Sequence, residues 1–359
     1  MDCCSFAFFY TQIRKYEGEI EVAHFFATVL PGLEYVLENE IRYKIADAKR
    51  VTLERGKVFF TSSLPVGALM VLRTADNLYR LIHRFRVGPH KIHLAGIEQE
   101  ISRLELSWLY GNRSGPVSFK VNASRMGKHT YSRFEAAEAA ARGIREARYR
   151  HDKAGTHEVE FRLDICHEEA VFSLRLTDAS FRYRKEARSF TRAALRPTIA
   201  HALVWLSKPE AMDVFVDPCC GSGTIVSERL AYPYFQIKGG DLSEEAVASA
   251  VENVGFHDRV EIRRWDARRL PIDAGYADKI VTNLPFGQQI STDEDIATLY
   301  QAVFKEMKRV LKKNGFALCL TDANAALQTA AEQIGFSWCK ETTLSLKGLH
   351  PSIYLLKKQ

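Results

Sequence analysis

The apolar and polar positions of the first half of the chain follow a mixed pattern of short strands and helices. Residues 159–165 alternate apolar and polar side chains, which is typical of an antiparallel strand with one buried face. Helical spacing of apolar residues predicts helices over residues 33–41, 66–72, 96–109 and 133–149. Strands are predicted over residues 24–30, 51–60 (a hairpin), 78–85, 117–123, 158–166 and 170–177. This half is therefore predicted to be α+β.

From residue 213 onward, short apolar strands alternate with helices. Strands are predicted over residues 213–217, 236–241, 260–264, 278–283 and 315–321. Strands that alternate with helices form a mostly parallel, doubly wound sheet. The last two strands, residues 337–345 and 352–357, leave no room for a helix between them and are expected to pair antiparallel at one edge. The predicted fold class is α/β, with a C-terminal Rossmann-like sheet of seven strands after an N-terminal α+β region.

Composition and charge narrow the class of protein. Hydrophobic residues make up 46% and charged residues 26% of the 359-residue chain, which is the usage of a globular protein long enough for two domains. No stretch reaches the roughly 18 apolar residues that a spanning helix needs, so we expect a cytoplasmic protein without membrane association. The net charge of +6 favours a polyanionic partner only modestly. Residues 1–20 show no clear periodicity and are left unassigned.

The seven cysteines are an odd number spread along the chain, which is poor material for disulfides. Cys3-Cys4 and Cys219-Cys220 are adjacent pairs, and no C-x-x-C or His/Cys cluster has the spacing of a zinc site. We therefore expect reduced thiols and no metal ion. The sequence does not fix the oligomeric state, for which a monomer is favoured.

A glycine turn follows the first strand of the C-terminal sheet. Gly221 and Gly223 would let a ligand approach the backbone at the carboxyl ends of the strands, where doubly wound sheets bind their ligands. A tight turn of purely structural use is the alternative. A dinucleotide or a nucleoside triphosphate fits poorly, because Val226 replaces the third glycine of G-x-G-x-x-G and no Gly-Lys-Ser/Thr follows.

Carboxylates follow the next two strands. Asp241 could accept both ribose hydroxyls of NAD or of S-adenosylmethionine, and Asp266 could accept an adenine amino group or simply cap a helix. The candidate cofactor-binding residues of this edge are Asp217, Pro218, Cys220, Gly221, Ser222, Gly223, Thr224, Asp241, Leu242, Asp266 and Ala267.

The segment Asn283-Leu-Pro-Phe-Gly follows the fourth strand, beside the same crevice. An exocyclic amine of a base is a poor nucleophile because its lone pair is delocalised into the ring, and acceptors that bind its N–H groups can localise that pair. Asn283 supplies a side-chain carbonyl and Leu284 a backbone carbonyl. Pro285 brings no competing donor, and Phe286 can stack on an extracted base. These four are the candidate catalytic residues, and an Asn-x-Pro turn of structural use is the alternative.

Residues 217–228, together with the Asn283-Leu-Pro-Phe-Gly segment, resemble the THUMP-containing guanine-N2 RNA methyltransferases. The Asn-Leu-Pro-Phe-Gly form is similar to the branch that makes N2-methylguanosine at position 6 of tRNA, in the acceptor stem. The resemblance continues upstream in Ser118-Phe-Lys-Val-Asn, Gly127-Lys-His and residues 171–184. It implies S-adenosylmethionine as the cofactor, tRNA as the partner and the N2 amine of guanine as the methyl acceptor.

The resemblance also implies a division of the chain. After an extension at residues 1–20, residues 21–95 would form a ferredoxin-like lobe, 96–185 a THUMP RNA-binding domain, 186–210 a linker helix and 211–359 the Rossmann-like methyltransferase domain. The segment Leu195-Arg-Pro-Thr-Ile-Ala is similar to a family segment that borders the cofactor pocket, which adds Arg196 and Thr198 to the cofactor candidates. The THUMP half is implied to grip the 3′ end of tRNA and so to measure the distance to the target base.

A tRNA enzyme must recognise shape and single-stranded ends, while Lys and Arg contacts to phosphate supply affinity. The candidate phosphate ligands, taken as a group because any one of them could be a solvated surface charge, are Lys120, Arg125, Lys128, Arg133 and Arg142. Two other hypotheses stay open. The target could be an rRNA guanine, an adenine N6 or a cytosine N4, or the chain could be a non-catalytic RNA-binding scaffold.

Overall fold

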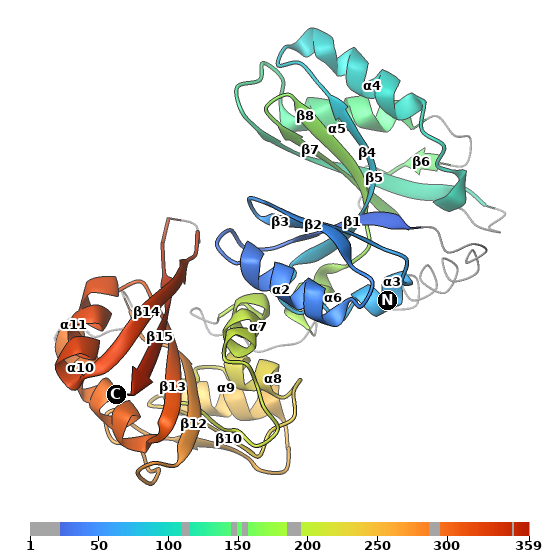
Figure 1. Ribbon diagram of the computed structural model, residues 1–359. Coiled ribbons are helices and arrows are strands. Elements are labelled where there is room, and N and C mark those ends of the chain that lie inside the picture. Colours follow the sequence, from blue (N-terminus) through green and yellow to red (C-terminus); the bar gives the residue numbers. More distant parts are fainter. Residues whose placement is uncertain are drawn as a thin grey trace.

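A computed structural model describes residues 22–109, 115–144, 149–152, 157–184, 195–286, 295–346 and 348–358. The unassigned residues 1–20 and Gly287 of the Asn-Leu-Pro-Phe-Gly segment lie outside these ranges. Two sheets organise the described chain, one formed before residue 184 and the other after residue 213. Figure 1 shows the helix α7 (Pro197–Leu206) between the two.

The N-terminal sheet has eight strands in the order β2-β3-β1-β4-β8-β7-β5-β6. Strands β2, β3, β1, β4, β8 and β7 pair antiparallel in succession, whereas β5 runs parallel to both β7 and β6. The predicted ferredoxin-like lobe (residues 21–95) and the predicted THUMP domain (residues 96–185) thus share one continuous sheet through the pairing of β4 with β8. The strands are β1 (Ala23–Thr28), β2 (Lys49–Glu54), β3 (Lys57–Ser62), β4 (Asn77–Arg86), β5 (Val117–Met126), β6 (Tyr149–His151), β7 (Val159–Cys166) and β8 (Glu169–Arg175).

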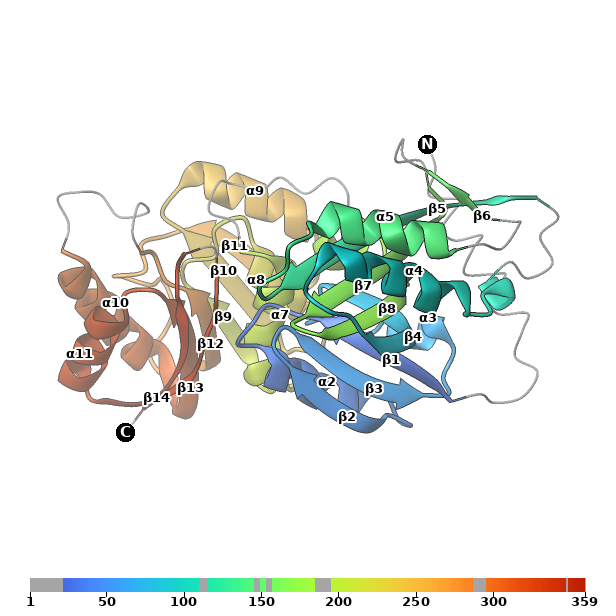
Figure 2. The ribbon, with the colours of Figure 1, turned by 90° about the horizontal axis from the view of Figure 1, so that it is seen from above.

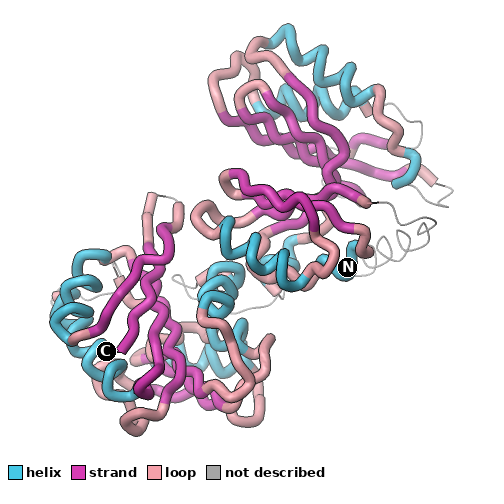
Figure 3. Tube along the Cα trace, viewed as in Figure 1, coloured by secondary structure: helices cyan, strands magenta, loops and turns pink. Residues whose placement is uncertain are grey.

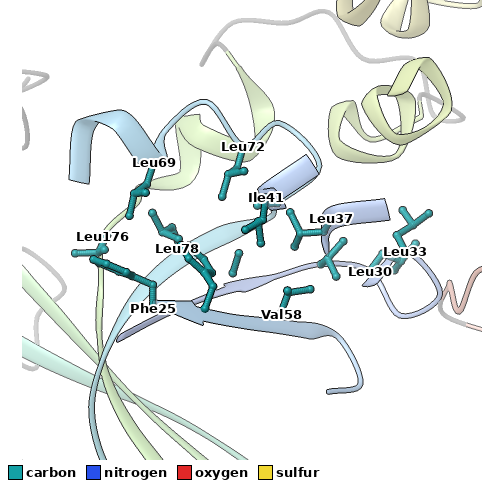
Figure 4. Close-up of a cluster of buried hydrophobic side chains, with 14 of the residues drawn as sticks. Phe25, Leu30, Leu33, Leu37, Ile41, Val58, Leu69, Leu72, Leu78 and Leu176 are labelled. Atoms are coloured by element: carbon teal, nitrogen blue, oxygen red, sulfur yellow. The ribbon is translucent and has the colours of Figure 1, made fainter. Parts of the chain in front are cut away.

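Two groups of helices cover this sheet (Figures 1 and 2). The first is α2 (Glu34–Lys44) with the short α3 (Val66–Leu69), and the second is α4 (Leu94–Ser102) with α5 (Arg133–Gly143). The apolar face of α2 is fully buried, because Leu37 and Ile41 pack against Phe25 and Val58 of the sheet (Figure 4). The side chain of Ser132 caps α5 by accepting from the Glu135 N–H at 3.2 Å.

The C-terminal sheet has seven strands in the order β11-β10-β9-β12-β13-β15-β14. The first five positions of that order are parallel; β15 pairs antiparallel with β14, as predicted, and also with β13. The Rossmann-like α/β fold is therefore confirmed. The strands are β9 (Val214–Asp217), β10 (Gln236–Asp241), β11 (Val260–Arg264), β12 (Ala277–Asn283), β13 (Leu311–Thr321), β14 (Phe336–Thr343) and β15 (Ser352–Lys358).

Helices lie on both faces of this sheet, as the tube drawing in Figure 3 shows. Phe215 of β9 packs with α8 (Thr224–Arg229) and α9 (Glu244–Val254), whereas the next residue, Val216, packs with α10 (Ile296–Val310) and α11 (Asn324–Ile334). Successive side chains of a strand point to opposite faces, so each face has its own core. Both faces of the central strand are consequently covered, which explains why Val214–Asp217 is buried throughout.

Three predicted helices were too long, and the first of them, expected over residues 66–72, ends at Leu69. The helix expected over residues 133–149 ends at Gly143, where an added Cβ would lie 2.8 Å from the Glu98 carbonyl oxygen, and Tyr149 instead begins the edge strand β6. Close packing on α4 therefore ends α5 early. The helix expected over 96–109 ends at Ser102, and a separate 3-10 turn at Ser107–Leu109 buries Leu109. The short helix α6 (Ala179–Tyr183) was not predicted.

Candidate active site

Three adjacent parallel strands end in polar residues at one edge of the C-terminal sheet. Asp241 ends β10, Asp217 ends β9 and Asn283 ends β12, and these strands are neighbours in the order β10-β9-β12. Because parallel strands present their carboxyl ends at the same edge, the fold gathers the three polar residues that the sequence singled out. This edge is the candidate active site.

The glycine turn after β9 is tied to the carboxylate of β10. The Gly221 N–H donates to Asp241 Oδ2 at 2.9 Å, and the Ser243 N–H donates to Asp241 Oδ1 at 3.0 Å. Each carboxylate oxygen has two lone pairs, so Asp241 keeps the capacity to accept two further hydroxyl donors. The arrangement fits a ligand with a vicinal diol.

The two glycines of the turn serve different purposes. Gly221 has a φ of 53°, and an added Cβ would meet nothing within 4 Å, so the space above it is open. Gly223 has a φ of 78°, and its added Cβ would lie 3.1 Å from Ala250 Cβ and Val254 Cγ2 of α9. Gly221 can therefore admit a ligand, whereas Gly223 is required by the packing of the turn against α9.

Trp265 was not recognised from the sequence as part of this edge. Its indole Nε1 donates to the Pro218 carbonyl at 3.0 Å, and the ring lies so close to Gly240 that an added Cβ there would be 2.3 Å from Trp265 Cε2. The adjacent glycines Gly239-Gly240 inside a strand were the available signal, because glycine in a strand interior marks a close approach. Trp265 thus holds the glycine turn in place through its hydrogen bond to Pro218 and its packing against Gly240.

Asp217 is fully buried and only partly satisfied. Its Oδ1 accepts the Cys219 N–H at 3.3 Å, while Oδ2 has no hydrogen-bond partner within the protein. Burial raises the pKa of this carboxyl to about 7, with the charge of Asp241 adding to the effect. An unpaired acceptor at such a position fits a positively charged donor such as an ammonium group. Burial also raises the pKa of the Cys220 thiol, which keeps it protonated and unsuited to nucleophilic attack.

Asn283 brings a second unpaired acceptor to the edge. Its side-chain Oδ1 is buried without a hydrogen-bond partner in the protein. Buried polar atoms are nearly always paired in folded proteins. An unpaired acceptor at the end of a strand, next to an open glycine turn, is therefore a position where a ligand's N–H is expected to bind.

The loop after Asn283 is fixed from behind. The Leu284 N–H donates to the Leu320 carbonyl at 3.0 Å, which extends the pairing of β12 with β13 by one residue. The Tyr300 hydroxyl of α10 donates to the Pro285 carbonyl at 2.9 Å and lies 2.7 Å from Thr321 Oγ1. Burial raises the pKa of Tyr300 well above its usual range, so the phenol stays a donor. Phe286, the last described residue of the segment, is half-buried.

The remaining cofactor candidates have more varied surroundings. Leu242 follows Asp241 at the carboxyl-end edge of the sheet. Its side chain is 57% exposed and offers an apolar surface to a ligand. Asp266 pairs with Arg268 at 2.7 Å, and hydrogen bonds from Arg268 lower the pKa of its carboxyl. Ser222 and Ala267 lie within the turns that flank this edge, and Thr224 is the first residue of α8; Ser222 and Thr224 are buried.

Arg196 and Thr198 lie at the start of α7. Arg196 is the exposed residue before the helix, whereas Thr198 is buried and its hydroxyl donates to Asp76 Oδ1 at 2.9 Å. The Thr198 side chain therefore contacts the N-terminal half. Its predicted place beside the cofactor stays a prediction.

Four of the five candidate phosphate ligands lie along one stretch of the N-terminal half. Lys120 and Arg125 are in β5, Lys128 is exposed in the following loop, and Arg133 is exposed at the start of α5. Arg142 is set apart at the far end of α5, about 14 Å along the helix axis from Arg133, given a rise of about 1.5 Å per residue. Its guanidinium pairs with Glu98 at 3.0 Å.

Among the described residues, no helix is both long and apolar enough to cross a membrane. In the same part of the chain, no three His, Cys, Asp or Glu side chains come together as a metal-binding group.

Comparison with known proteins agrees with this geometry. Residues 184–352 match the family described as UPF0020, RMKL-like, methyltransferase domain. The crystal structure of TrmN from Thermus thermophilus superposes with a TM-score of 0.79 at 25% sequence identity, covering 94% of this chain and 99% of that one.

Two curated relatives carry matching names. A Bos taurus protein named tRNA (guanine(6)-N(2))-methyltransferase THUMP3 is 30% identical over 262 residues, and the match covers 67% of this chain but 51% of that protein. This chain thus spans about half the length of that relative. A Thermus thermophilus protein named tRNA (guanine(6)-N2)-methyltransferase is 28% identical over 341 residues, covering 92% of this chain and 98% of that protein. Residues 184–352 are thus similar to the UPF0020, RMKL-like methyltransferase domain, and the resemblance of the chain to the THUMP-containing guanine-N2 RNA methyltransferases is confirmed.

Proposed function

We propose that this protein methylates the exocyclic N2 amine of a guanine in tRNA, at position 6 of the acceptor stem, with S-adenosylmethionine as the methyl donor. The observation that carries the proposal is the unpaired Asn283 Oδ1, which lies at the same sheet edge as the unpaired Asp217 Oδ2 and the open Gly221. The names of the curated relatives, which specify guanine 6 and N2, support the choice of base and position. We expect the protein to act in the cytoplasm as a monomer.

Different residues of this edge would bind different parts of S-adenosylmethionine. Asp241 would accept the ribose hydroxyls and Asp217 Oδ2 the ammonium of the amino-acid end, with the backbone of Gly221 beneath. Leu242 would cover one face of the adenine. The Asp266 carboxylate would accept a hydrogen bond from the adenine amino group. When bound, S-adenosylmethionine supplies an electrophilic methyl group on a sulfonium.

The Asn283 loop would hold the acceptor base. Asn283 Oδ1 would accept one N–H of the guanine amine, the Leu284 carbonyl would accept the other, and Phe286 would stack on the base. The Pro285 carbonyl is already held by Tyr300 and is not a second acceptor. The bound donor would supply the methyl group, and the guanine nitrogen, held by Asn283 and the Leu284 carbonyl, would lose one proton to solvent as it gains that group. Positioning, more than a strong base, would provide the acceleration.

The N-terminal half would supply the grip on RNA. We propose the division of the chain at residues 21–95, 96–185, 186–210 and 211–359, with the 96–185 segment as the RNA-binding THUMP domain. Lys128 and Arg133 are the phosphate ligands favoured by their exposure, and Lys120 and Arg125 of β5 lie close to them along the chain. Arg142 is the weakest member of the group, since Glu98 already neutralises it.

The decisive experiment incubates bulk tRNA with the protein and labelled S-adenosylmethionine, digests the RNA and identifies the methylated nucleoside by mass spectrometry. We expect N2-methylguanosine, mapped to position 6. A product in rRNA, or methylated adenine or cytosine, would replace the substrate assignment. Cofactor binding without transfer to any RNA would favour the non-catalytic scaffold.

A further inference from the structure

The halves of the protein meet across a buried ion cluster that the proposed chemistry does not use. Glu228 of α8 belongs to the catalytic half, and its side chain is completely buried. Its two carboxylate oxygens are bound by guanidiniums from the N-terminal half, Arg73 at 2.9 Å and Arg184 at 3.2 Å. We name these three residues the interdomain clamp.

The N-terminal half holds the clamp arginines in place. The side chain of Glu40 in α2 is also completely buried. It accepts hydrogen bonds from the backbone N–H groups of Arg73 at 2.8 Å and of Thr74 at 2.9 Å. The Arg184 guanidinium also donates to the carbonyls of Arg73 and of Phe181, the latter at 2.6 Å. The two guanidiniums thus face Glu228 in a fixed geometry.

A chain of neutral hydrogen bonds crosses the same junction. Thr74 Oγ1 lies 2.9 Å from Nδ1 of the buried His201 in α7, and His201 Nε2 lies 2.7 Å from the Tyr232 hydroxyl. Burial lowers the pKa of His201 well below its usual range, so the ring is neutral and links one donor to one acceptor. Figures 1 and 2 show α7 between α2 and α8, as this chain of contacts requires.

A second contact lies on the other side of the junction. The Thr342 hydroxyl of β14 donates to the Gly32 carbonyl at 2.8 Å, and the Ser345 N–H donates to the Pro31 carbonyl at 3.1 Å. Gly32 has a φ of 105°, and an added Cβ would lie 2.3 Å from the Thr343 carbonyl oxygen. One contact would leave the halves free to rotate about it, whereas two separate contacts oppose that rotation.

Burying a carboxylate is unfavourable unless its partners stay in place. A small shift of one half against the other would lengthen both ion pairs while Glu228 stays buried, and its charge would then be poorly compensated in a low-dielectric interior. The clamp therefore resists changes in the distance between the RNA-binding surface near Lys128 and the catalytic edge at Asn283. We propose that Glu228, with Arg73 and Arg184, fixes the distance between the RNA-binding surface and the catalytic edge and so determines which nucleotide of a bound tRNA is methylated. The inference rests on the proposed function and makes these three residues positioning residues.

The test compares the full-length wild-type protein with Glu228→Gln. The matched control is Glu306→Gln, which removes an ion pair with Arg309 inside the catalytic half and leaves the junction untouched. Each protein receives tRNA and labelled cofactor, and every methylated position is mapped and quantified. We expect Glu228→Gln to lower kcat/KM at the wild-type position by about 10²-fold, the scale of a displacement of about 1 Å, and to place methyl groups on neighbouring guanines. The control is expected to keep the wild-type position, even at reduced yield.

A distance measurement tests the clamp without RNA. The exposed free cysteines Cys166 of β7 and Cys339 of β14 lie one on each half and can carry spin labels once Cys3, Cys4 and the half-buried Cys219 are replaced by serine. We expect one narrow distance distribution for the wild type and the control, and a broader one for Glu228→Gln. If Glu228→Gln does not fold, Arg73→Lys, which keeps the charge but loses the guanidinium geometry, carries the same expectations.

Unchanged site selectivity together with an unchanged distance distribution in a folded clamp variant would overturn the inference and leave the proposed function intact. A wild-type protein that transfers methyl groups to no tRNA would overturn the proposed function, and this inference with it.

Discussion

Replacing Asp217 by asparagine is expected to stabilise the ligand-free protein at neutral and alkaline pH. The carboxyl is completely buried, its Oδ2 has no partner, and its pKa is raised to about 7. Asparagine keeps the shape of the side chain and the acceptor for the Cys219 N–H but carries no charge. A buried, uncompensated negative charge is thereby removed.

The sign and size follow from proton linkage. Between about pH 4 and pH 7 the folded protein binds a proton at Asp217 that the unfolded chain does not, so the wild-type free energy of unfolding falls as pH rises. A pKa of about 7 against an ordinary value of 3.8 corresponds to about 4 kcal/mol once the pH exceeds the folded-state pKa. The amide N–H that the Asp217→Asn change introduces must find its own acceptor, so we expect a gain of about 2 to 4 kcal/mol.

The assay is urea unfolding of both proteins across a pH series from about 5 to about 8.5. The stability difference should grow with pH and level off above about pH 7. Asp278→Asn is the control, because Asp278 pairs with Lys312 at 2.7 Å, and its replacement should lower stability. An Asp217→Asn protein that is less stable than the wild type at about pH 8 would refute the reasoning.

The other predictions concern the edge and the RNA surface. Asn283→Ala should slow single-turnover methyl transfer by about 10²-fold or more without changing cofactor affinity, while Asn314→Ala, an exposed residue toward the start of β13, should transfer normally. Asp241→Ala should weaken cofactor binding by about 10- to 100-fold in calorimetry, and unchanged affinity would remove its role. Tyr300→Phe should destabilise the protein by about 1 to 3 kcal/mol and slow transfer, because the Pro285 carbonyl loses its donor; a wild-type rate would show that this bond does not position the loop. Lys128→Ala with Arg133→Ala should reduce the salt slope of tRNA binding by about 2, whereas Arg142→Ala should change it little.

The periodicity of the sequence was sufficient for the C-terminal sheet. Strands β9, β10, β12 and β13 are each followed by a helix, so pattern alone located β9, β10 and β12 and the polar residues that end them. It also located β14 and β15, because too few residues separate them for a crossover. The pairing of β4 with β8, which joins the N-terminal lobes into one sheet, left no local signal, since strand partners distant in sequence are chosen by the packing of the whole domain.

The hydrogen-bond acceptors of the site could be predicted from the sequence, whereas the residues that hold the loop in place could not. Asn283 and Asp241 stand at strand ends, where position along the sequence translates directly into position at the sheet edge. Tyr300 lies in a helix whose apolar face is core by pattern, and nothing in that pattern shows that its hydroxyl binds the Pro285 carbonyl. A support of this kind is visible only once two elements are placed together.

The interdomain clamp shows the same limit in its strongest form. A Glu in a Ser-Glu-Arg segment is by default a solvated surface residue, because ionised side chains are almost never fully buried unless they are paired. Glu228 is buried because Arg73 and Arg184 meet it from 155 and 44 residues away along the chain. Neither partner alone predicts the contact, and replacing either one would leave one oxygen of the buried carboxylate without its ion pair. The fixed relation between the two halves is thus encoded in pairs of residues distant in sequence, whereas the catalytic edge is encoded in short contiguous motifs.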